Sequence, residues 1–388
     1  MSARTIGVVM NGVTGRMGYR QHLLRSVLAI NAEGGVPLSD GRRILLEPVL
    51  VGRSEPKLRD LAERHDISDW TTDLSEALAD PGNLIYFDAQ VTHARVASVT
   101  KAIEAGKHIY AEKPTAETLE DALSLAKAAK AAGVKNGVVQ DKLFLPGLLK
   151  LKRLVDGGFF GRILSVRGEF GYWVFEGGWQ QAQRPSWNYR AEDGGGIILD
   201  MFPHWAYVLE TLFGRIEAVT AKAVTHIPER IDESGQAYAA TADDAAYGLF
   251  ELAGGAIAQI NSSWCVRVNR DELVEFQVDG TEGSAVAGLR NCRIQHRSTT
   301  PKPVWNPDLP ATERFRDQWQ EVPDNGEFDN GFKIQWELFI RHVLEDAPFP
   351  YDLAAGARGV RIAEAGLLSS AEGRRIELPA AGTEEGTP

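Results

Sequence analysis

Two places in the sequence hold side chains that could carry out acid–base chemistry. Lys113 stands directly before Pro114, which fixes its own φ and favours an extended backbone at the lysine. The amine therefore projects in a defined direction from the end of a buried strand. Asp200 and His204 follow the glycine run at 194–196 and are one helical turn apart, so they could share one hydrogen-bonded site. A histidine in such a pair can serve as a general acid or base.

Each of these residues also has a plain structural interpretation. Lys113 could be a solvated lysine at a strand end, and His204 could be a structural histidine. Because proline is tolerated in the first turn of a helix, Pro203 makes Asp200 a plausible N-cap. We expect catalytic roles because the Asp200–His204 pair follows an aromatic loop.

The segment at 176–196 and its flanks, called the aromatic loop below, is rich in aromatic residues, glycine and arginine. Aromatic faces stack on sugar rings, and an arginine fork binds carboxylate, phosphate or sulfonate oxygens. The alternatives are core packing for the rings and ordinary salt bridges, to Glu192 or Asp193, for the arginines. We expect this segment to form the wall of a substrate site. The candidate substrate-binding residues are Lys113, Trp173, Arg184, Trp187, Tyr189, Arg190, Asp200 and His204.

The N-terminal region has the pattern of a dinucleotide-binding turn. Residues 5–10 form a short apolar run typical of a buried strand, and a GxxGxxG sequence and a helical pattern follow it. Glycines allow a tight turn and a close approach of the backbone to a pyrophosphate, which the helix N-terminus then receives. The turn residues expected to bind the cofactor are Gly12, Thr14, Gly15, Arg16, Met17 and Gly18.

The end of the second expected strand bears on the choice between NAD and NADP. This strand, at 47–51, is followed by Gly52, Arg53 and Ser54 rather than by an acidic residue. An acidic residue at this place binds the ribose hydroxyls of NAD, whereas an arginine suits a 2′-phosphate. Arg53 and Ser54 therefore join the candidate cofactor-binding residues. They favour NADP, although the nearby Glu55 leaves NAD open.

The order of the expected elements predicts an α/β protein with two domains. Helices and strands alternate up to about residue 140, which indicates a Rossmann domain with a parallel sheet at 1–141. Strand patterns with few helices follow, which indicates an α+β domain with a large, mostly antiparallel sheet at 142–380. Residues 381–388 are expected to form a tail.

Composition narrows the class of protein. The chain has 388 residues, 44% of them hydrophobic and 24% charged, with a formal charge of −11. This charge argues against nucleic-acid or anionic-membrane partners, and no apolar run approaches the length of a membrane span. The two cysteines show no metal-binding spacing. We expect a cytoplasmic protein without a signal peptide and without a metal.

The glycine turn, the Glu112-Lys113-Pro114 sequence and the Asp200…His204 pair together resemble the Gfo/Idh/MocA family of NAD(P)-dependent sugar and polyol oxidoreductases. The resemblance covers nearly the whole chain and includes the domain order. It implies that Lys113 polarises and orients the reacting hydroxyl, that His204 takes its proton and that Asp200 positions the substrate.

The same resemblance adds Glu112, Lys113 and Thr92 to the candidate cofactor contacts. Here the sequence departs from the family pattern, because many members carry Asn and His where this chain has Thr92 and Arg95. The usual contacts near the cofactor ribose are therefore not assured in this chain.

Three functions remain open at this stage. The first is an oxidoreductase that removes hydride from a secondary, C3-type hydroxyl of a sugar or glycoside, with NAD or NADP. The second is a glycosidase that works by transient oxidation, elimination, water addition and hydride return on an anionic sugar such as a sulfoquinovoside or glycuronide. It would need an acid or base near C1–C2, for which Tyr172, Tyr189, Glu176 and Glu192 are candidates. The third is a sensor that only binds dinucleotide.

The second domain is also expected to form a homodimer or homotetramer. Its strands between Ile216 and Arg297 carry apolar residues on both alternations, as in the run from Ala256 to Ile260. One face of the sheet would then need a cover that the expected helices are too few to supply.

Overall fold

The computed structural model describes residues 4–267, 272–304, 306–310 and 314–379. The chain separates into two compact units. The first runs to Phe144 and also takes in Asp329–Glu364, and the second consists of Leu145–Phe328 and the residues from Ala365 onward. The predicted domains were 1–141 and 142–380. Their boundary lies close to the observed one at 144/145, but the prediction did not place 329–364 in the first unit. The predicted tail at 381–388 lies outside the described residues.

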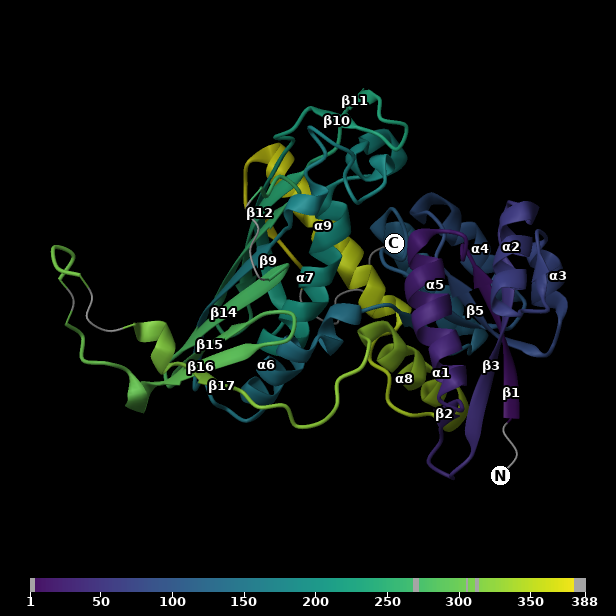
Figure 1. The fold of residues 1–388 in the computed structure, drawn as a ribbon, viewed down its shortest axis with the longest axis horizontal. Helices are drawn as coiled ribbons and strands as arrows, with labels where there is room; N and C mark the ends of the chain where they lie inside the picture. Colours follow the sequence, from purple (N-terminus) through teal and green to yellow (C-terminus); the bar gives the residue numbers. More distant parts are fainter. Residues whose placement is uncertain (1–3, 268–271, 305, 311–313, 380–388) are drawn as a thin grey trace. The chain divides into compact units, whose positions relative to one another are not determined.

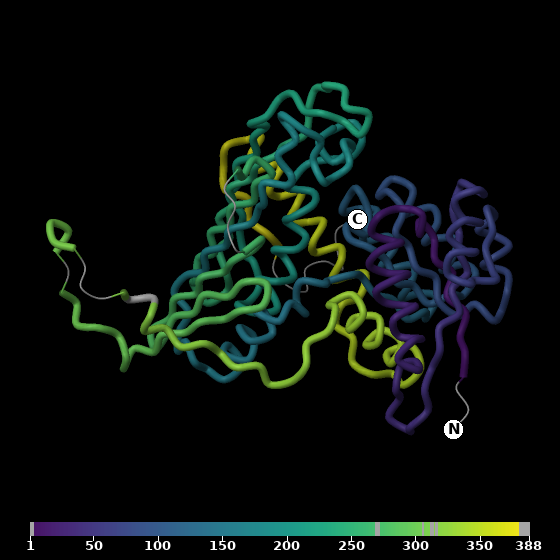
Figure 2. Tube along the Cα trace, in the orientation of Figure 1, coloured from purple at the N-terminus to yellow at the C-terminus, as the bar shows by residue number. Residues whose placement is uncertain are grey.

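The return of the chain to the first unit has a simple cause. Helix α8 (Gly331–Glu345) buries Trp336, Phe339 and Ile340 in the same core cluster as Val8 of the first strand. In Figure 2 the yellow-green trace of this helix lies among the N-terminal elements of the unit. Fully burying aromatic and branched side chains stabilises the fold by about 1.5–3 kcal/mol each. The sequence alone shows α8 only as one more amphipathic helix, without its partner.

The first unit is built on a seven-stranded sheet with the path β2-β3-β1-β5-β6-β7, and β4 pairs with β3. All pairings are parallel except that of β2 with β3. Val8 and Met10 of β1 join one core cluster and Val9 joins another, so both faces are covered. The strands are β1 (Arg4–Asn11), β2 (Val36–Pro37), β3 (Arg43–Val51), β4 (Trp70–Thr71), β5 (Asn83–Asp88), β6 (His108–Ala111) and β7 (Asn136–Val138).

Helices lie on both faces of this sheet (Figure 1). The first of them, η1, has π-helical hydrogen bonding, in which each turn takes in one residue more than in an α-helix. Its buried side includes His22, Leu23 and Val27. The helices are η1 (Gly18–Val27), α1 (Leu28–Ala32), α2 (Glu55–His65), α3 (Leu74–Ala79), α4 (Thr92–Glu104), α5 (Leu119–Ala132), η2 (Asp141–Phe144), α8 and the first part of α9 (Leu353–Glu372).

The second unit is built on a nine-stranded sheet with the order β17-β16-β15-β14-β8-β13-β12-β9-β18. Only the pairing of β13 with β8 is parallel. The strands are β8 (Ile163–Phe170), β9 (Ile216–Val224), β12 (Ala245–Leu252), β13 (Ile257–Ser263), β14 (Val274–Gly280), β15 (Gly283–Ala287), β16 (Cys292–His296), β17 (Gln320–Glu321) and β18 (Ile376–Glu377); β10 (Glu229–Ile231) and β11 (Ala237–Ala239) form a separate hairpin.

Helices α6 (Pro146–Asp156) and α7 (Ile197–Phe213) pack on one face of this sheet (Figure 1). On β12 and β13, every second residue is buried, and the alternate positions expose Tyr247, Leu249 and Ile257, each by more than 40%. Short 3₁₀ turns complete the unit: η3 (Trp173–Phe175), η4 (Ser186–Tyr189), η5 (Ala191–Asp193), η6 (Arg297–Thr299) and η7 (Phe315–Gln318). The predicted fold class, a Rossmann domain followed by a mostly antiparallel sheet domain, is confirmed.

No helix in the described part of the chain is long and apolar enough to cross a membrane. Likewise, the described residues contain no group of three or more His, Cys, Asp or Glu side chains that could hold a metal ion. The cytoplasmic location stays a prediction.

Candidate functional site

The glycine turn between β1 and η1 is packed so closely that side chains would not fit. A Cβ atom on Gly12, whose φ is +86°, would lie 2.6 Å from the carbonyl carbon of Ala89, and one on Gly18 would lie 2.6 Å from the carbonyl oxygen of Gly12. Thr14, Gly15 and Arg16 form the exposed rim, and Met17 is half-buried. A turn without side chains at the carboxyl end of a central parallel strand fits a dinucleotide phosphate.

The end of β3 lies beside this turn. Gly12 N–H donates to the carbonyl oxygen of Val51 at 3.2 Å, and a Cβ on Gly52 would be 3.8 Å from Cγ2 of Thr14. Arg53 is exposed, and Ser54 caps α2 without a hydrogen bond from its side chain. Both residues therefore remain accessible next to the glycine turn, as a contact with the adenosine side of a dinucleotide requires.

Arg95 points into the protein and joins three segments at the carboxyl ends of the strands. It is 2% exposed, and its Nε donates to Oδ1 of Asp88 at 3.0 Å. Its two Nη atoms donate to the carbonyl oxygens of Gln90, at 2.7 Å, and Pro114. Arg95 therefore has a structural role, because its hydrogen bonds tie these segments together. Thr92 is half-buried at the first position of α4.

Lys113 follows β6 and is half-buried, and the peptide bond to Pro114 is cis. Its backbone N–H donates to Oε2 of Glu112 at 3.1 Å. Burial would raise the pKa of the Glu112 carboxyl, but the hydrogen bond from His22 and the positive charges of Lys113 and Arg95 hold this pKa below its usual value. Glu112 is therefore a buried carboxylate adjacent to the proposed catalytic lysine.

Sequence reasoning missed two residues behind Glu112. His22 Nε2 lies 2.8 Å from Oε1 of Glu112, and Trp336 Nε1–H donates to Nδ1 of His22 at 3.0 Å. His22 and Trp336 are fully buried. No local sequence pattern links them, because Trp336 comes from the far end of the chain.

Helix α7 begins three residues earlier than Asp200, so the expectation that Asp200 is its N-cap is wrong. Gly196 is the N-cap residue, and Pro203 lies inside the helix. The cap comes from a distant segment, because the Asp243 carboxylate accepts the N–H of Ile198 at 2.8 Å. Burial raises the pKa of Asp243 despite this hydrogen bond. Asp200 instead lies within the first turn of α7, where a carboxylate is favourable.

Asp200 faces Arg184 of the aromatic loop. Nη2 of Arg184 lies 2.9 Å from Oδ2 of Asp200, and both side chains are about four-fifths buried. The guanidinium carbon also lies 5.0 Å from the ring centre of Phe175 and 4.7 Å from that of Trp264. The partner is thus Asp200 rather than Glu192 or Asp193. The pair gives Asp200 a fixed orientation on α7.

His204 lies one turn beyond Asp200 and is 5% exposed. Its Nδ1 is 2.6 Å from the hydroxyl oxygen of Tyr207 on the same helix. This contact fixes the ring about its Cβ–Cγ bond. Any proton transfer with a substrate would therefore use Nε2.

The aromatic loop divides into accessible and buried rings. Trp173 and Trp187 are each 41% exposed, so they can offer a face to a ligand. Tyr189 is 1% exposed, and its hydroxyl donates to the carbonyl oxygen of Phe175 at 2.7 Å. Its ring is therefore packed in the core, and the expectation that Tyr189 binds substrate stays a prediction.

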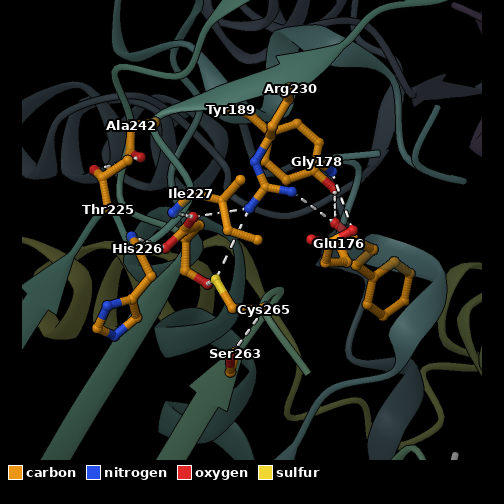
Figure 3. A network of polar contacts seen from close by, with 12 residues as sticks. Glu176, Gly178, Tyr189, Thr225, His226, Ile227, Arg230, Ala242, Ser263 and Cys265 are labelled. Carbon is orange, nitrogen blue, oxygen red and sulfur yellow. Dashed lines mark hydrogen bonds and ion pairs between the residues drawn. The ribbon is translucent and has the colours of Figure 1, made fainter. Parts of the chain in front are cut away.

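A buried arginine holds Tyr189 in place (Figure 3). The guanidinium carbon of Arg230 lies 4.2 Å from the centre of the Tyr189 ring, Nη2 is 2.8 Å from Oδ2 of Asp244, and Nη1 donates to the carbonyl oxygen of Phe175 at 3.0 Å. Cys265 lies 3.9 Å from Nη2, and burial raises the pKa of its thiol to about 12. The Arg230–Asp244 pair therefore supports the loop that carries Arg184.

Arg190 also has partners within the unit. Nη1 lies 3.8 Å from Oδ2 of Asp193, and the guanidinium carbon lies 4.5 Å from the ring centre of Tyr238. Arg184 and Arg190 thus both face carboxylates. The charge of each arginine is therefore already paired within the protein, without an acidic substrate.

The acid–base residues considered for a glycosidase are largely occupied by contacts within the protein. Glu176 is 2% exposed and pairs with Arg267 at 2.5 Å. Glu192 accepts from the Thr241 hydroxyl, and this hydrogen bond lowers the pKa of the carboxyl. Tyr172 packs its ring 5.1 Å from that of Trp173.

Two family models match the chain. Residues 6–140 match the oxidoreductase family with an NAD-binding Rossmann fold, and residues 148–286 match the GFO/IDH/MocA C-terminal domain. A D-xylose dehydrogenase from Paenarthrobacter nicotinovorans is 63% identical over 378 residues, which cover 96% of this chain and 97% of the relative. The chain belongs to the Gfo/Idh/MocA oxidoreductase family. The predicted family, the NAD(P)-dependent oxidoreductase class and the nicotinamide cofactor are thereby confirmed.

More distant proteins share the fold. A levoglucosan dehydrogenase from Pseudarthrobacter phenanthrenivorans is 28% identical over 252 residues, or 61% of this chain and 64% of the relative. The solved structure of a levoglucosan dehydrogenase with NADH and levoglucosan has a TM-score of 0.79 at 23% identity, and the match covers 97% of this chain and 100% of that chain. At this identity the structural match establishes the fold.

Proposed function

We propose that this protein is an NAD(P)-dependent dehydrogenase of D-xylose or a closely related neutral sugar. The observation that carries the proposal is the 63% identity to a D-xylose dehydrogenase along almost the whole of both chains. The reaction removes hydride from a carbon that bears a hydroxyl group and releases one proton, which leaves a carbonyl group. The paired states of Arg184 and Arg190 support a neutral substrate over the anionic sugar expected from the sequence.

The glycine turn supplies the phosphate site for the cofactor. Because Cβ atoms would fill the space at Gly12 and Gly18, the backbone there can approach a pyrophosphate closely. Thr14, Gly15 and Arg16 are exposed at the rim. When bound, the nicotinamide ring accepts the hydride.

The proposal assigns distinct roles to the three candidate catalytic side chains. Lys113 donates a hydrogen bond to the reacting hydroxyl oxygen and orients it. His204 accepts the hydroxyl proton at Nε2, since Nδ1 is committed to Tyr207. Asp200, oriented by Arg184, accepts a hydrogen bond from a neighbouring sugar hydroxyl.

The test begins with unaltered protein, D-xylose and either NAD⁺ or NADP⁺, with reduced cofactor followed by its absorbance. Lys113→Ala and His204→Ala should each lower kcat by at least ~10²-fold while binding of the reduced cofactor persists. Near-normal kcat in either variant would remove that residue from the mechanism.

The chain offers a matched control for each variant. Lys107 precedes β6, and its Nζ donates to the carbonyl oxygen of Asp80. His226 pairs with the Tyr247 hydroxyl at 3.1 Å, as His204 pairs with Tyr207, but is exposed. Lys107→Met and His226→Ala should keep kcat within about twofold.

Product analysis identifies the oxidised carbon. A lactone would mean oxidation at C1, and a keto sugar would mean the C3-type oxidation expected from the sequence. The glycosidase alternative predicts release of free sugar from a xyloside without net reduction of cofactor. Activity on a hexuronate or sulfoquinovoside, with none on the neutral sugar, would restore the anionic-substrate hypothesis.

A further inference from the structure

The buried residue His22 has no role in the function proposed so far. It lies on η1 directly after the glycine turn, is 0% exposed and packs its ring 4.2 Å from that of Phe87. A polar side chain without exposure must be hydrogen-bonded on both ring nitrogens or incur a desolvation cost. Both nitrogens of His22 have such partners, Glu112 and Trp336.

The partners of His22 determine its protonation state. An indole N–H is only a donor, so Nδ1 of His22, 3.0 Å from Nε1 of Trp336, must accept. The proton of the neutral ring therefore sits on Nε2 and is donated to Oε1 of Glu112 over 2.8 Å. A second proton on Nδ1 would face the indole N–H. Trp336 thereby selects one tautomer of the neutral His22 ring.

The surroundings of the pair leave the negative charge on Glu112. The rings against His22 are those of Phe87, Phe332 and Trp336, which carry no charge. Besides His22, the groups that lower the pKa of the Glu112 carboxyl are Lys113 and Arg95. Both are cations and favour the carboxylate.

The Glu112 carboxylate is held at both ends. Oε1 accepts from His22, and Oε2 accepts from the backbone N–H of Lys113 at 3.1 Å. The backbone N–H of Glu112 itself donates to the carbonyl oxygen of Asp88 at 2.8 Å. Because a carboxylate is planar, fixing both oxygens fixes the plane, and with it the peptide from which the Lys113 side chain departs.

We propose that His22, held in one tautomer by Trp336, is a positioning residue for Lys113 and acts through Glu112. The inference rests on the catalytic role proposed for Lys113. In this arrangement one chain of hydrogen bonds connects three elements: helix η1 after the glycine turn, the end of β6 before Lys113, and helix α8. Misplacement of a catalytic group by about 1 Å can cost ~10²-fold in rate, so loss of the chain should lower kcat rather than raise KM.

Three substitutions separate positioning from simple stability. His22→Leu removes the donor to Glu112, whereas His22→Gln keeps a donor, because the glutamine amide nitrogen can occupy the place of Nε2. Trp336→Phe keeps an aromatic ring and removes the indole N–H. The control is Gln335→Met, since Gln335 is equally buried on α8 but bonds the backbone of Val138 and Gln140.

The expected result is a split between the kinetic constants. His22→Leu should lower kcat by about 10- to 100-fold, with less than threefold change in the KM for sugar and in the affinity for reduced cofactor measured by fluorescence. His22→Gln should recover most of the loss. Gln335→Met should lower the melting temperature and leave kcat within about twofold. Equal kcat losses in His22→Leu and His22→Gln, or in His22→Leu and Gln335→Met, would overturn the positioning role.

A second measurement does not depend on turnover. In protein with ¹⁵N-labelled histidine, the His22 signals should show a protonated Nε2 and a bare Nδ1. In Trp336→Phe the Nδ1 signal should move, because the indole N–H no longer donates to it. A doubly protonated or Nδ1-protonated His22 in the unaltered protein would overturn the inference, even if D-xylose proved not to be a substrate. Absence of sugar oxidation with the expected tautomer would instead count against the proposed function alone.

Discussion

The substitution Arg230→Met should destabilise the second unit far more than the loss of an ordinary ion pair. It removes the hydrogen bonds of the guanidinium to Phe175 and Asp244, both within 3.0 Å, and leaves the Asp244 carboxylate fully buried. Methionine approximately replaces the volume of the side-chain stem. The backbone N–H groups of His226 and Ile227 still donate to this carboxylate, at 2.7 and 2.9 Å. The buried charge of Asp244 therefore loses its cation but keeps two hydrogen-bond donors.

The magnitude follows from this count of partners. Removing one partner of a buried ion pair typically costs 3–5 kcal/mol, and the two remaining donors place Arg230→Met at the low end, near ~3 kcal/mol. With a denaturant slope of about 3 kcal/mol per molar urea, the unfolding midpoint of this unit should fall by ~1 M.

An exposed pair in the same unit provides the control. Arg375 lies 2.5 Å from Glu251, and both side chains are 41% exposed. Arg375→Met should cost at most ~1 kcal/mol, because solvent screens such pairs. Urea unfolding followed by circular dichroism gives the free energies, and hydrogen exchange of the peptides around 172–196 locates the loosening.

One result would refute this reasoning: a midpoint shift for Arg230→Met no larger than that for Arg375→Met. It would mean that the Arg230–Asp244 pair does not stabilise the aromatic loop.

Further predictions concern the cofactor, the helix cap and the assembly. If Arg53 contacts a 2′-phosphate, Arg53→Ala should weaken NADP binding much more than NAD binding in calorimetric titrations. The prediction is contradicted if the unaltered protein binds NAD more tightly than NADP and Arg53→Ala does not change this. Gly196→Ala should cost about 1–3 kcal/mol in urea unfolding, because φ is +128° and a Cβ would lie 2.5 Å from a buried carboxylate, whereas Gly235→Ala, with φ +82° and open space, should cost less. The exposed sheet face should make a dimer or tetramer that Leu249→Lys with Ile257→Lys disrupts; a monomer mass for unaltered protein in light scattering would end this idea.

Much of the fold could be predicted from local patterns. Apolar runs followed by glycine turns and amphipathic helices identify a parallel sheet, and its strand ends are where ligands bind. This logic located the glycine turn, Arg53 and Lys113 at the carboxyl ends of β1, β3 and β6. It also placed Asp200 and His204 on one helix.

The partners of these residues were beyond sequence reasoning because they come from distant segments. Trp336 is 314 positions from His22, and Asp243 is 45 positions from Ile198. The start of α7 was misplaced for the same reason, since its cap is supplied from outside the helix. The burial of Tyr189 was also beyond sequence reasoning, because aromatic rings in a loop look alike in sequence whether they face solvent or core.

The path of the chain between its two units has a consequence for biosynthesis. The first unit needs Asp329–Glu364 to complete its core, yet the whole of Leu145–Phe328 is made in between. At bacterial and eukaryotic elongation rates this interval lasts roughly 10–40 s, during which the nascent Rossmann sheet lacks the cover of Trp336 and Phe339. The N-terminal segment therefore emerges from the ribosome long before its core is complete, and its apolar surface is open to aggregation or to chaperones in that time.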